Sequence, residues 1–290
     1  MTAASAAQDP FAAPMRGSGP RIIFDVAEPR RLERAMTDLS IGLRRWRLAL
    51  TLAWLDIRNR YRGSVLGPFW LTLSTGLMLG GMGFLYSVLF HETLRSYLPF
   101  LAVSMIVWNL ISQVVSDATG SLIAAEGMIR QSPLPYTIHA LRCVFRNVII
   151  AAHNLPLIAI VLVICEVVPG PEIALVVPGL AILALDGLAA ALLLGMLCAR
   201  FRDLGQIVAS AMQLAFFMTP IFWKPTSLGH YQSLLLLDPF YVLMQVVRGP
   251  LLGSGAPPLI WLSALAYTSL FCIVSFSFFV RFRGRIAFWV

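Results

Sequence analysis

The chain has 290 residues, of which 58% are hydrophobic and 12% are charged, and its mean hydropathy is +0.79. Soluble domains carry about 25% charged residues, so a soluble globular fold is excluded and lipid must surround most of the apolar surface. The formal net charge is +8, but the arginines cluster beside apolar runs, which is typical of membrane flanks rather than of a nucleic-acid-binding surface.

The N-terminal part of the chain divides into a tail and a predicted interface helix. Residues 1–28 begin with a stretch rich in Ala, Pro, Gly and Ser that lacks the apolar core of a secretory signal, and we expect a disordered cytoplasmic tail. Between 29 and 61, apolar residues recur every three or four positions from Met36 to Tyr61, which predicts an amphipathic helix in the membrane interface. The alternative is a helix packed against a soluble partner.

A charged stretch and a Gly-Pro break precede the first long apolar run. The arginines place this stretch on the cytoplasmic face, because Lys and Arg stay on that side of a membrane. Pro suits the first turn of a helix, where its missing N–H has no partner in any case. The residues of this basic motif are Asp56, Arg60, Tyr61, Arg62, Gly67 and Pro68.

Long apolar runs predict an all-α membrane protein with one transmembrane domain over residues 29–285. Each run is close to the ~20 residues that a helix needs to cross about 30 Å of hydrocarbon. The six predicted spans are about 69–90, 97–116, 147–165, 173–198, 204–222 and 259–280.

Two connections between these spans are predicted to be structured. Residues 119–140 are too polar to cross the bilayer, and we expect a short helix around 121–130 followed by a Pro-x-Pro break. Residues 224–252 hold apolar pieces that are each too short to span, which predicts two short re-entrant or interfacial helices.

Basic residues are distributed unequally between the two predicted sides. Nineteen of the 22 fall in 1–62, 119–146, 200–202 and 281–285, whereas three fall in the opposite loops. Because Lys and Arg stay on the cytoplasmic side, this asymmetry predicts cytoplasmic N- and C-termini.

Several kinds of chemistry find no support in the residues present. The single lysine, Lys224, precedes Pro225, so the chain has no Gly-Lys-Ser/Thr phosphate loop and any ATP hydrolysis must come from another chain. His91-Glu92 does not begin a zinc-binding HExxH motif, because Arg95 stands where the second His belongs. The four cysteines are scattered in apolar segments, so we expect buried small side chains and neither a disulfide framework nor a metal site.

Asp186 lies near the middle of the fourth predicted span, where a charge is costly. His153 and Asn154 in the third predicted span are its candidate partners. One interpretation is a protonated or hydrogen-bonded packing group, and the other is a proton relay or a polar group of a pore.

Aromatic residues crowd the first and fifth predicted spans. Ring faces stack on flat apolar surfaces, including the C–H faces of sugars, so these residues are candidates for a substrate channel. Membrane-interface belts and ordinary helix packing are the alternative explanation. The residues are Phe69, Trp70, Phe84, Tyr86, Phe216, Phe217, Phe222 and Trp223.

A resemblance to a known family begins in the basic motif, which reads Asp56-x-x-x-Arg60-Tyr61-Arg62-Gly-Ser-x-Leu66-Gly67-Pro68-x-Trp70. It resembles the polysaccharide-export branch of the type-2 ABC transporter permeases, which move O-antigen, capsule and teichoic-acid chains. The resemblance runs from about 47 to 285 and includes Arg200-Phe-Arg-Asp203, Thr219-Pro220-Ile-Phe-Trp223 and Asp238-Pro239-Phe240. Many relatives carry Asn-Pro where this chain carries Asp-Pro.

The resemblance implies roles for these segments. Two copies would form a homodimer with a continuous channel between them, lined by the first and fifth spans. Residues 224–252 would close the channel on the outer side, with the gate at Asp238, Pro239 and Phe240. Two separate ATPase subunits would bind ATP and Mg²⁺, so this chain would hold no cofactor itself. The coupling loop 119–140, assisted by the interface helix, would dock on the ATPase through Ser121, Glu126, Arg130, Pro133 and Tyr136.

We therefore expect the membrane subunit of an ATP-driven exporter of a lipid-linked polysaccharide in the bacterial inner membrane. O-antigen is the favoured substrate, which would place the protein in lipopolysaccharide biosynthesis. The expected partners are membrane lipids, the glycan, a second copy and the ATPase, and nucleic acid is not among them. The alternatives are an exporter of a small lipid or drug, a proton-coupled carrier that uses Asp186, and an intramembrane enzyme that modifies glycans.

Overall fold

The computed structural model describes residues 30–64, 67 and 69–290. The predicted tail 1–28, and Leu66 and Pro68 of the basic motif, lie outside the described residues. The described part of the chain is helical and contains no strand. The elements in chain order are α1 (Arg31–Arg44), α2 (Trp46–Arg60), α3 (Phe69–Leu89), α4 (Leu94–Gly120), η1 (Ile123–Ala125), α5 (Glu126–Gln131), α6 (Tyr136–Ala152), α7 (Leu155–Ile164), η2 (Pro171–Leu175), α8 (Val176–Arg200), α9 (Leu204–Met218), η3 (Pro225–Leu237), α10 (Pro239–Leu251), α11 (Pro258–Phe282), η4 (Arg283–Arg285) and α12 (Ile286–Trp289).

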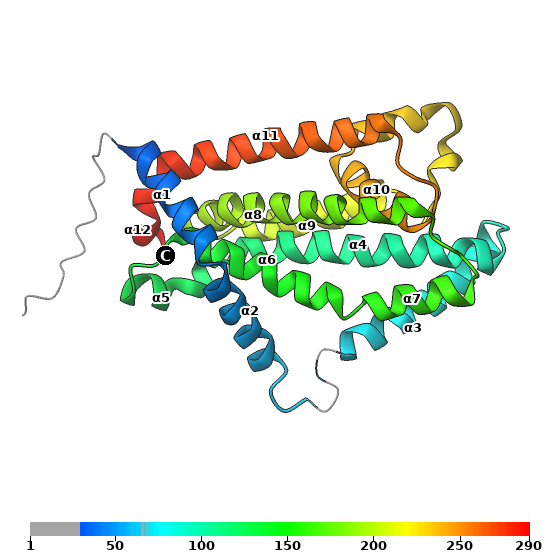
Figure 1. Ribbon diagram of the computed structural model, residues 1–290, viewed down its shortest axis with the longest axis horizontal. Helices are drawn as coiled ribbons and strands as arrows, with labels where there is room; N and C mark the ends of the chain where they lie inside the picture. Colours follow the sequence, from blue (N-terminus) through cyan, green and yellow to red (C-terminus); the bar gives the residue numbers. More distant parts are fainter. Residues whose placement is uncertain (1–29, 65–66, 68) are drawn as a thin grey trace, which may run out of the picture.

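The long helices lie side by side in a bundle (Figure 1). α8 is central and packs against α4, α6, α10 and α11. α3 packs chiefly on α4, and its buried residues are Leu79, Gly83 and Ser87. α1, α5 and α12 gather at one end of the bundle, which we name the α5 end, and α10, η3 and the α3–α4 connection lie at the other, the α10 end (Figure 1).

Helices of the described chain are long and apolar enough to cross a membrane in five places, or in six if the bent pair η3 and α10 is one span. This confirms the prediction of an all-helical protein with several spans, and four of the five agree closely with the predicted runs. The five segments are Phe69–Leu89, Leu94–Gly120, Tyr136–Ile164, Pro171–Arg200 and Pro258–Trp289.

The fifth predicted span, 204–222, contains a helix that is shorter than predicted. α9 has 15 residues, a length of about 22 Å, which is less than the ~30 Å of hydrocarbon that a span must cross. The helix ends because Thr219 precedes Pro220, whose ring disfavours helical backbone angles in the residue before it, and Thr219 has a ψ of 137°. Residues 219–224 continue the chain in non-helical form.

The third predicted span, 147–165, begins earlier in the structure than the sequence indicates. α6 starts at Tyr136, inside the predicted coupling loop, and continues after a break into α7. Arg142 and Arg146 make this stretch too polar for a span by composition, but carboxylates from other helices pair with both side chains. Pro156 in the first turn of α7 accounts for the break, because it has no N–H to donate to the preceding turn.

The predicted interface helix 29–61 is two helices, α1 and α2, which meet at Arg45. Met36, Trp46 and Trp54 of the predicted apolar stripe are 54%, 45% and 55% exposed, so most of that stripe does not face the protein. Contact of the stripe with lipid stays a prediction. The face that is buried, and that packs on α6, consists mainly of small side chains: Ala35, Asp38, Gly42, Ala49, Ala53 and Ile57.

Residues 224–252 form two short helices, η3 and α10, which are bent by 108° relative to each other. Gly229 interrupts η3 with a φ of 52°, a left-handed conformation that other residues rarely adopt. Asp238 lies at the bend and caps the start of α10. The re-entrant position of this pair in lipid stays a prediction.

Candidate functional site

Six aromatic rings pack together where α3, α4, α9 and α10 meet. The ring centroid of Phe216 lies 5.9 Å from Trp108, 5.3 Å from Phe217 and 5.9 Å from Phe222. Four predicted channel residues thus meet one predicted gate residue and Trp108. We name these residues the aromatic cluster: Tyr86, Trp108, Phe216, Phe217, Phe222 and Phe240.

The remaining predicted channel residues lie outside the aromatic cluster. Phe69 and Trp70 are at the opposite end of α3, and are 59% and 57% exposed. Phe84 is 67% exposed, and Trp223 donates its Nε1–H to the Phe217 carbonyl oxygen at 3.5 Å. The eight predicted rings therefore do not form one group within the described chain, although several of them present a face to the outside.

The predicted gate residue Asp238 ties the end of α9 to the start of α10. Its Oδ2 accepts a hydrogen bond from the Thr219 hydroxyl at 2.7 Å, and its Oδ1 accepts from the Phe240 backbone N–H at 2.9 Å. The second bond satisfies one of the free N–H groups of the first turn of α10, and Pro239 occupies the first helical position. The sequence Asp-Pro-Phe thus builds a helix start and anchors it to the preceding segment.

Asp238→Asn is expected to change the free energy of unfolding by less than about 0.5 kcal/mol, because the amide oxygen still caps α10 and the hydroxyl can turn to accept. Asp238→Ala removes both bonds and is expected to cost about 1–2 kcal/mol. Thermal unfolding in detergent, followed by reaction of the buried Cys143, Cys165 and Cys198 with a maleimide dye, measures both. An Asn variant as unstable as the Ala variant would show that the charge of Asp238 is required.

Arg248 of α10 is buried against two other elements. Its Nη1 donates to the Ser104 hydroxyl on α4 at 2.9 Å and to the Pro220 carbonyl oxygen at 2.8 Å. Its Nε and Nη2 donate to Gln245 Oε1 at 2.9 and 2.7 Å, and the guanidinium lies 4.6 Å from the centroid of the Phe100 ring. None of these contacts in the described chain is a carboxylate, so neutral acceptors and a ring face compensate the buried charge.

An ion pair and a hydrogen bond hold the segment after α9 at the α10 end. Lys224 Nζ pairs with Glu92 Oε1 at 2.7 Å, which joins the segment after α9 to the α3–α4 connection. The hydrogen bond from Lys224 lowers the pKa of Glu92. Tyr97 of α4 donates its hydroxyl to the Phe222 carbonyl oxygen. The non-helical residues 219–224 are therefore held from several sides.

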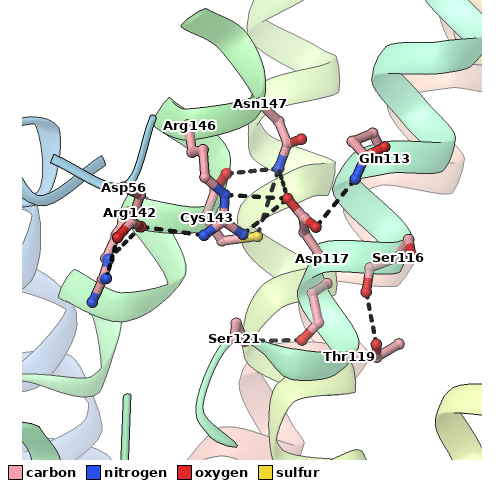
Figure 2. A network of polar contacts seen from close by, with 11 residues as sticks. Asp56, Gln113, Ser116, Asp117, Thr119, Ser121, Arg142, Cys143, Arg146 and Asn147 are labelled. Carbon is pink, nitrogen blue, oxygen red and sulfur yellow. Dashed lines mark hydrogen bonds and ion pairs between the residues drawn. The ribbon is translucent and has the colours of Figure 1, made fainter. Parts of the chain in front are cut away.

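Figure 2 shows a network of charged side chains that joins α2, α4 and α6. Asp56 of the basic motif accepts from Arg142 Nε at 2.7 Å and pairs with Arg146 Nη1 at 3.2 Å. Arg146 also pairs with Asp117 on α4 at 2.8 Å, and Asn147 donates to the same carboxylate at 3.0 Å. Burial alone raises the pKa of Asp56, but the hydrogen bonds and charges of the two arginines outweigh it and hold the pKa below its ordinary 3.8.

The other described residues of the basic motif lie at the end of α2 and beyond it. Arg60 and Arg62 are exposed, and Tyr61 is half-buried. Gly67 has a φ of 54° and donates its N–H to the Ser64 hydroxyl at 3.1 Å. The turn before α3 thus requires the left-handed conformation that glycine adopts without strain.

The predicted coupling residues fall into two groups at the α5 end. Ser121 and Tyr136 are buried inside the bundle, so they position the loop and do not present a surface to another protein. Glu126 and Arg130 form an ion pair on α5 at 2.8 Å, with side chains 43% and 61% exposed, and Pro133 is exposed in the connection to α6. Of the five predicted coupling residues, these three are thus the ones that another protein can reach, and docking through them stays a prediction.

Asp186 does not contact its predicted partners. Its Oδ2 accepts from the Thr268 hydroxyl on α11 at 2.9 Å, whereas the Nδ1 of His153 lies 2.7 Å from the Ile149 carbonyl oxygen. The pairing of Asp186 with His153 or Asn154 is therefore wrong, because the bond to this carboxylate comes from Thr268 on α11. Asp186 is the one charged residue among the described residues that line an apolar cavity of about 1080 Å³.

Three residues with defined partners were not identified as functional candidates from the sequence. Trp108 is 4% exposed in an apolar run, and nothing local distinguishes it from ordinary packing. Asp38 is 2% exposed but lies off the apolar stripe of its segment, where a carboxylate is usually solvated. Arg248 is a lone charge inside an apolar piece of chain, and that signal alone marks it as a candidate.

Several membrane-length helices, a partly buried charge network that joins two of them to α2 and a bent helix pair at one end define a multi-pass membrane protein. The family model described as ABC-2 type transporter matches residues 47–252, and the chain belongs to that family. It is thus the permease subunit of a transporter and not an enzyme. Membership also implies an ABC ATPase as partner, in agreement with the missing phosphate loop.

Two curated relatives are similar over most of their length. The O-antigen export system permease protein RfbA of Myxococcus xanthus is 24% identical over 226 residues, which cover 77% of this chain and 87% of that protein. The O-antigen export system permease protein RfbA of Klebsiella pneumoniae is 21% identical over 234 residues, which cover 80% of this chain and 90% of that protein. Both matches support the polysaccharide-export branch that the motifs resemble.

Proposed function

We propose that the chain is the channel-forming membrane subunit of an ATP-driven exporter of a lipid-linked polysaccharide, with O-antigen as its substrate. The observation that carries this proposal is the similarity, over more than three quarters of the chain, to two O-antigen export permeases. The motifs that gave the resemblance agree with it: Gly67 forms a left-handed turn before α3, and Asp238 caps the bend before α10.

In the proposed arrangement two copies of the chain form a channel and two ATPase subunits dock at the α5 end, in the cytoplasm of the bacterium. α1 and α12 share that end, and the uneven distribution of basic residues along the sequence supports its cytoplasmic side. The exposed pair Glu126 and Arg130 on α5 is accessible to the ATPase. The bent pair η3 and α10 then lies on the outer side, where it closes the channel.

The proposal is tested by deletion and by reconstitution. Deletion of the gene is expected to abolish surface O-antigen and to leave lipid-linked glycan inside the cell. The chain purified with its ATPase in lipid vesicles is expected to move that glycan when ATP is added. Normal surface polysaccharide in the deletion strain, or an ATPase that never co-purifies, would exclude the proposal.

Two other outcomes would favour other functions. An exporter of a small lipid or drug would leave the glycan unaffected and change the export of another molecule. Transport that continues without an ATPase and is lost in Asp186→Asn would indicate a proton-coupled carrier. The hydrogen bond between Asp186 and Thr268 supports the packing interpretation of this carboxylate instead.

Trp70→Ala and Phe217→Ala are each expected to slow glycan export by about threefold to tenfold, which corresponds to the loss of one ring-stacking contact. Both rings are more than half exposed, at 57% and 58%, and Phe217 also contacts Phe216 and Phe222 of the aromatic cluster. Trp54→Ala is the matched control, because Trp54 is 55% exposed on α2, outside the proposed channel. If export falls equally in the control and in the two variants, Trp70 and Phe217 act through packing or membrane contact and not by binding the glycan.

A further inference from the structure

Asp38 on α1 is the point where three parts of the α5 end meet. Its side chain is 0% exposed, and it pairs with Arg283 Nε, just beyond α11, at 2.8 Å. On α6 it accepts from the backbone N–H groups of Tyr136 and Thr137 at 3.2 and 3.1 Å and from the Thr137 hydroxyl at 2.9 Å. One carboxylate thus makes four hydrogen bonds to two other elements.

The start of α6 depends on this carboxylate. The first N–H groups of a helix have no partner within the helix, and the residue before the first turn usually supplies an acceptor. Pro135 occupies that position in α6 and makes no side-chain cap. Asp38 provides the missing acceptor from α1, and its negative charge lies at the positive end of the α6 dipole. The first turn of α6 is therefore completed only when α1 is in place.

The backbones of α1 and α6 also approach each other closely beside Asp38. A Cβ atom placed on Gly42 would lie 2.5 Å from the Cβ of Thr137, so no side chain fits between the two helices. The following helix, α2, is bound to the same helix α6 by the ion pairs of Asp56. α1 and α2 thus move with α6 unless these contacts break.

We infer that Asp38 is a positioning residue that transmits movement of α1 to the coupling loop and to α11. The loop that carries α5 ends where α6 begins, so a shift of α1 pulls directly on the end of the loop through Tyr136 and Thr137. The ion pair with Arg283 passes the same shift to α11. This inference rests on the proposed function, because it assigns a path for the force that the ATPase applies.

The test measures the number of glycan chains exported for each ATP hydrolysed by the reconstituted complex of the chain with its ATPase. A purely structural residue would change the amount of complex that assembles but not this ratio. Asp38→Asn keeps the shape and one acceptor oxygen, and removes the charge that Arg283 and the helix dipole require. We expect the ratio to fall about tenfold, within the usual range of a coupling free energy.

A milder pair of variants addresses the case in which Asp38→Asn assembles poorly. Thr137→Val removes one of the four hydrogen bonds and is expected to lower the ratio about threefold, whereas Thr137→Ser retains the hydroxyl and is expected to keep it. Glu33→Gln is the matched control on α1, because Glu33 is an exposed carboxylate that forms a local pair with Arg30.

The outcomes separate this inference from the proposed function. If the unchanged complex exports glycan with ATP, and Asp38→Asn or Thr137→Val does so at the unchanged ratio, the role assigned to Asp38 is wrong and the exporter stands. If the unchanged complex neither binds an ATPase nor exports glycan, the proposed function itself fails. A lowered ratio in Thr137→Val that Thr137→Ser does not share supports the inference.

Discussion

Arg248→Met is expected to lower the free energy of unfolding by about 3–5 kcal/mol. The guanidinium of Arg248 is 2% exposed and serves three acceptors: the Ser104 hydroxyl, the Pro220 carbonyl and the Gln245 amide oxygen. Met has a similar length but leaves these acceptors without a donor, and each buried unsatisfied group costs about 1–3 kcal/mol. α10 would also lose its hydrogen bond to the Pro220 carbonyl, although Asp238 would still join it to Thr219.

Two further variants make this result specific. Arg248→Lys keeps the charge, but a single ammonium group cannot replace the planar fork that reaches three acceptors, so we expect about half of the loss to remain. Arg202→Met is the control, because Arg202 is exposed and its replacement should change stability by less than about 0.5 kcal/mol. The reaction of the buried cysteines with a maleimide dye during heating measures all three. A Met variant as stable as the native chain would contradict the stabilising role of Arg248.

Asp56→Ala is expected to lower the free energy of unfolding by about 2–3 kcal/mol at neutral pH, because it leaves Arg142 partly buried without its carboxylate. Arg146 retains its pair with Asp117, which limits the loss. In the double variant of Asp56→Ala and Arg142→Ala, the decrease in the free energy of unfolding should be smaller than the sum of the two single decreases. Each single change leaves one charge unpaired, and the double change does not. Asp203→Ala, at an exposed carboxylate, is the control.

The contribution of Asp56 should disappear in acid. Its pKa is lowered in the folded protein, so the folded state binds the proton more weakly than the unfolded state does. The stabilisation is therefore complete above pH 3.8, the ordinary value of the group, and is lost as the pH falls through the lower folded value. The stabilities of the native chain and of Asp56→Ala should converge over that acid range. A difference that stays constant from neutral pH down to acid would show that Asp56 acts through packing and not through its charge.

The apolar runs predicted most of the long helices because a membrane span is a local property of the sequence. About 20 apolar residues in a row are sufficient evidence for a span, whatever the rest of the chain does. α3, α4, α8 and α11 follow these runs closely. α9 ends early because of a single proline, Pro220, whose effect on the preceding residue is also local.

The start of α6 was missed for a different reason. Arg142 and Arg146 read as loop residues by composition, and only their pairing with Asp56 and Asp117, which lie on other helices, allows them into a long helix. The capping of α6 by Asp38 likewise joins residues far apart in the sequence. A single sequence contains each of these residues but not the distances between them.

The candidate site shows the same division between local and long-range information. The sequence groups the aromatic residues by predicted span, but the structure groups them across helices: Tyr86 of α3 meets Phe222, while Phe69 of the same helix packs on the His153 ring. Ser121 and Tyr136 were assigned to docking because they belong to the coupling loop, yet both are buried. Residue type and position in a motif therefore indicate which segments of the chain hold the candidate site. The packing of the helices then decides which side chains of those segments can reach a partner.

The non-helical residues after α9 have backbone carbonyl groups that no helix satisfies. Side chains from α4 and α10 supply the donors instead: Tyr97 for Phe222, and Arg248 for Pro220. Irregular backbone that is buried away from water is tolerated only when protein groups satisfy it in this way. The conformation of this segment can therefore change by the exchange of a few side-chain hydrogen bonds. The helices on either side of it would keep all of their own turns.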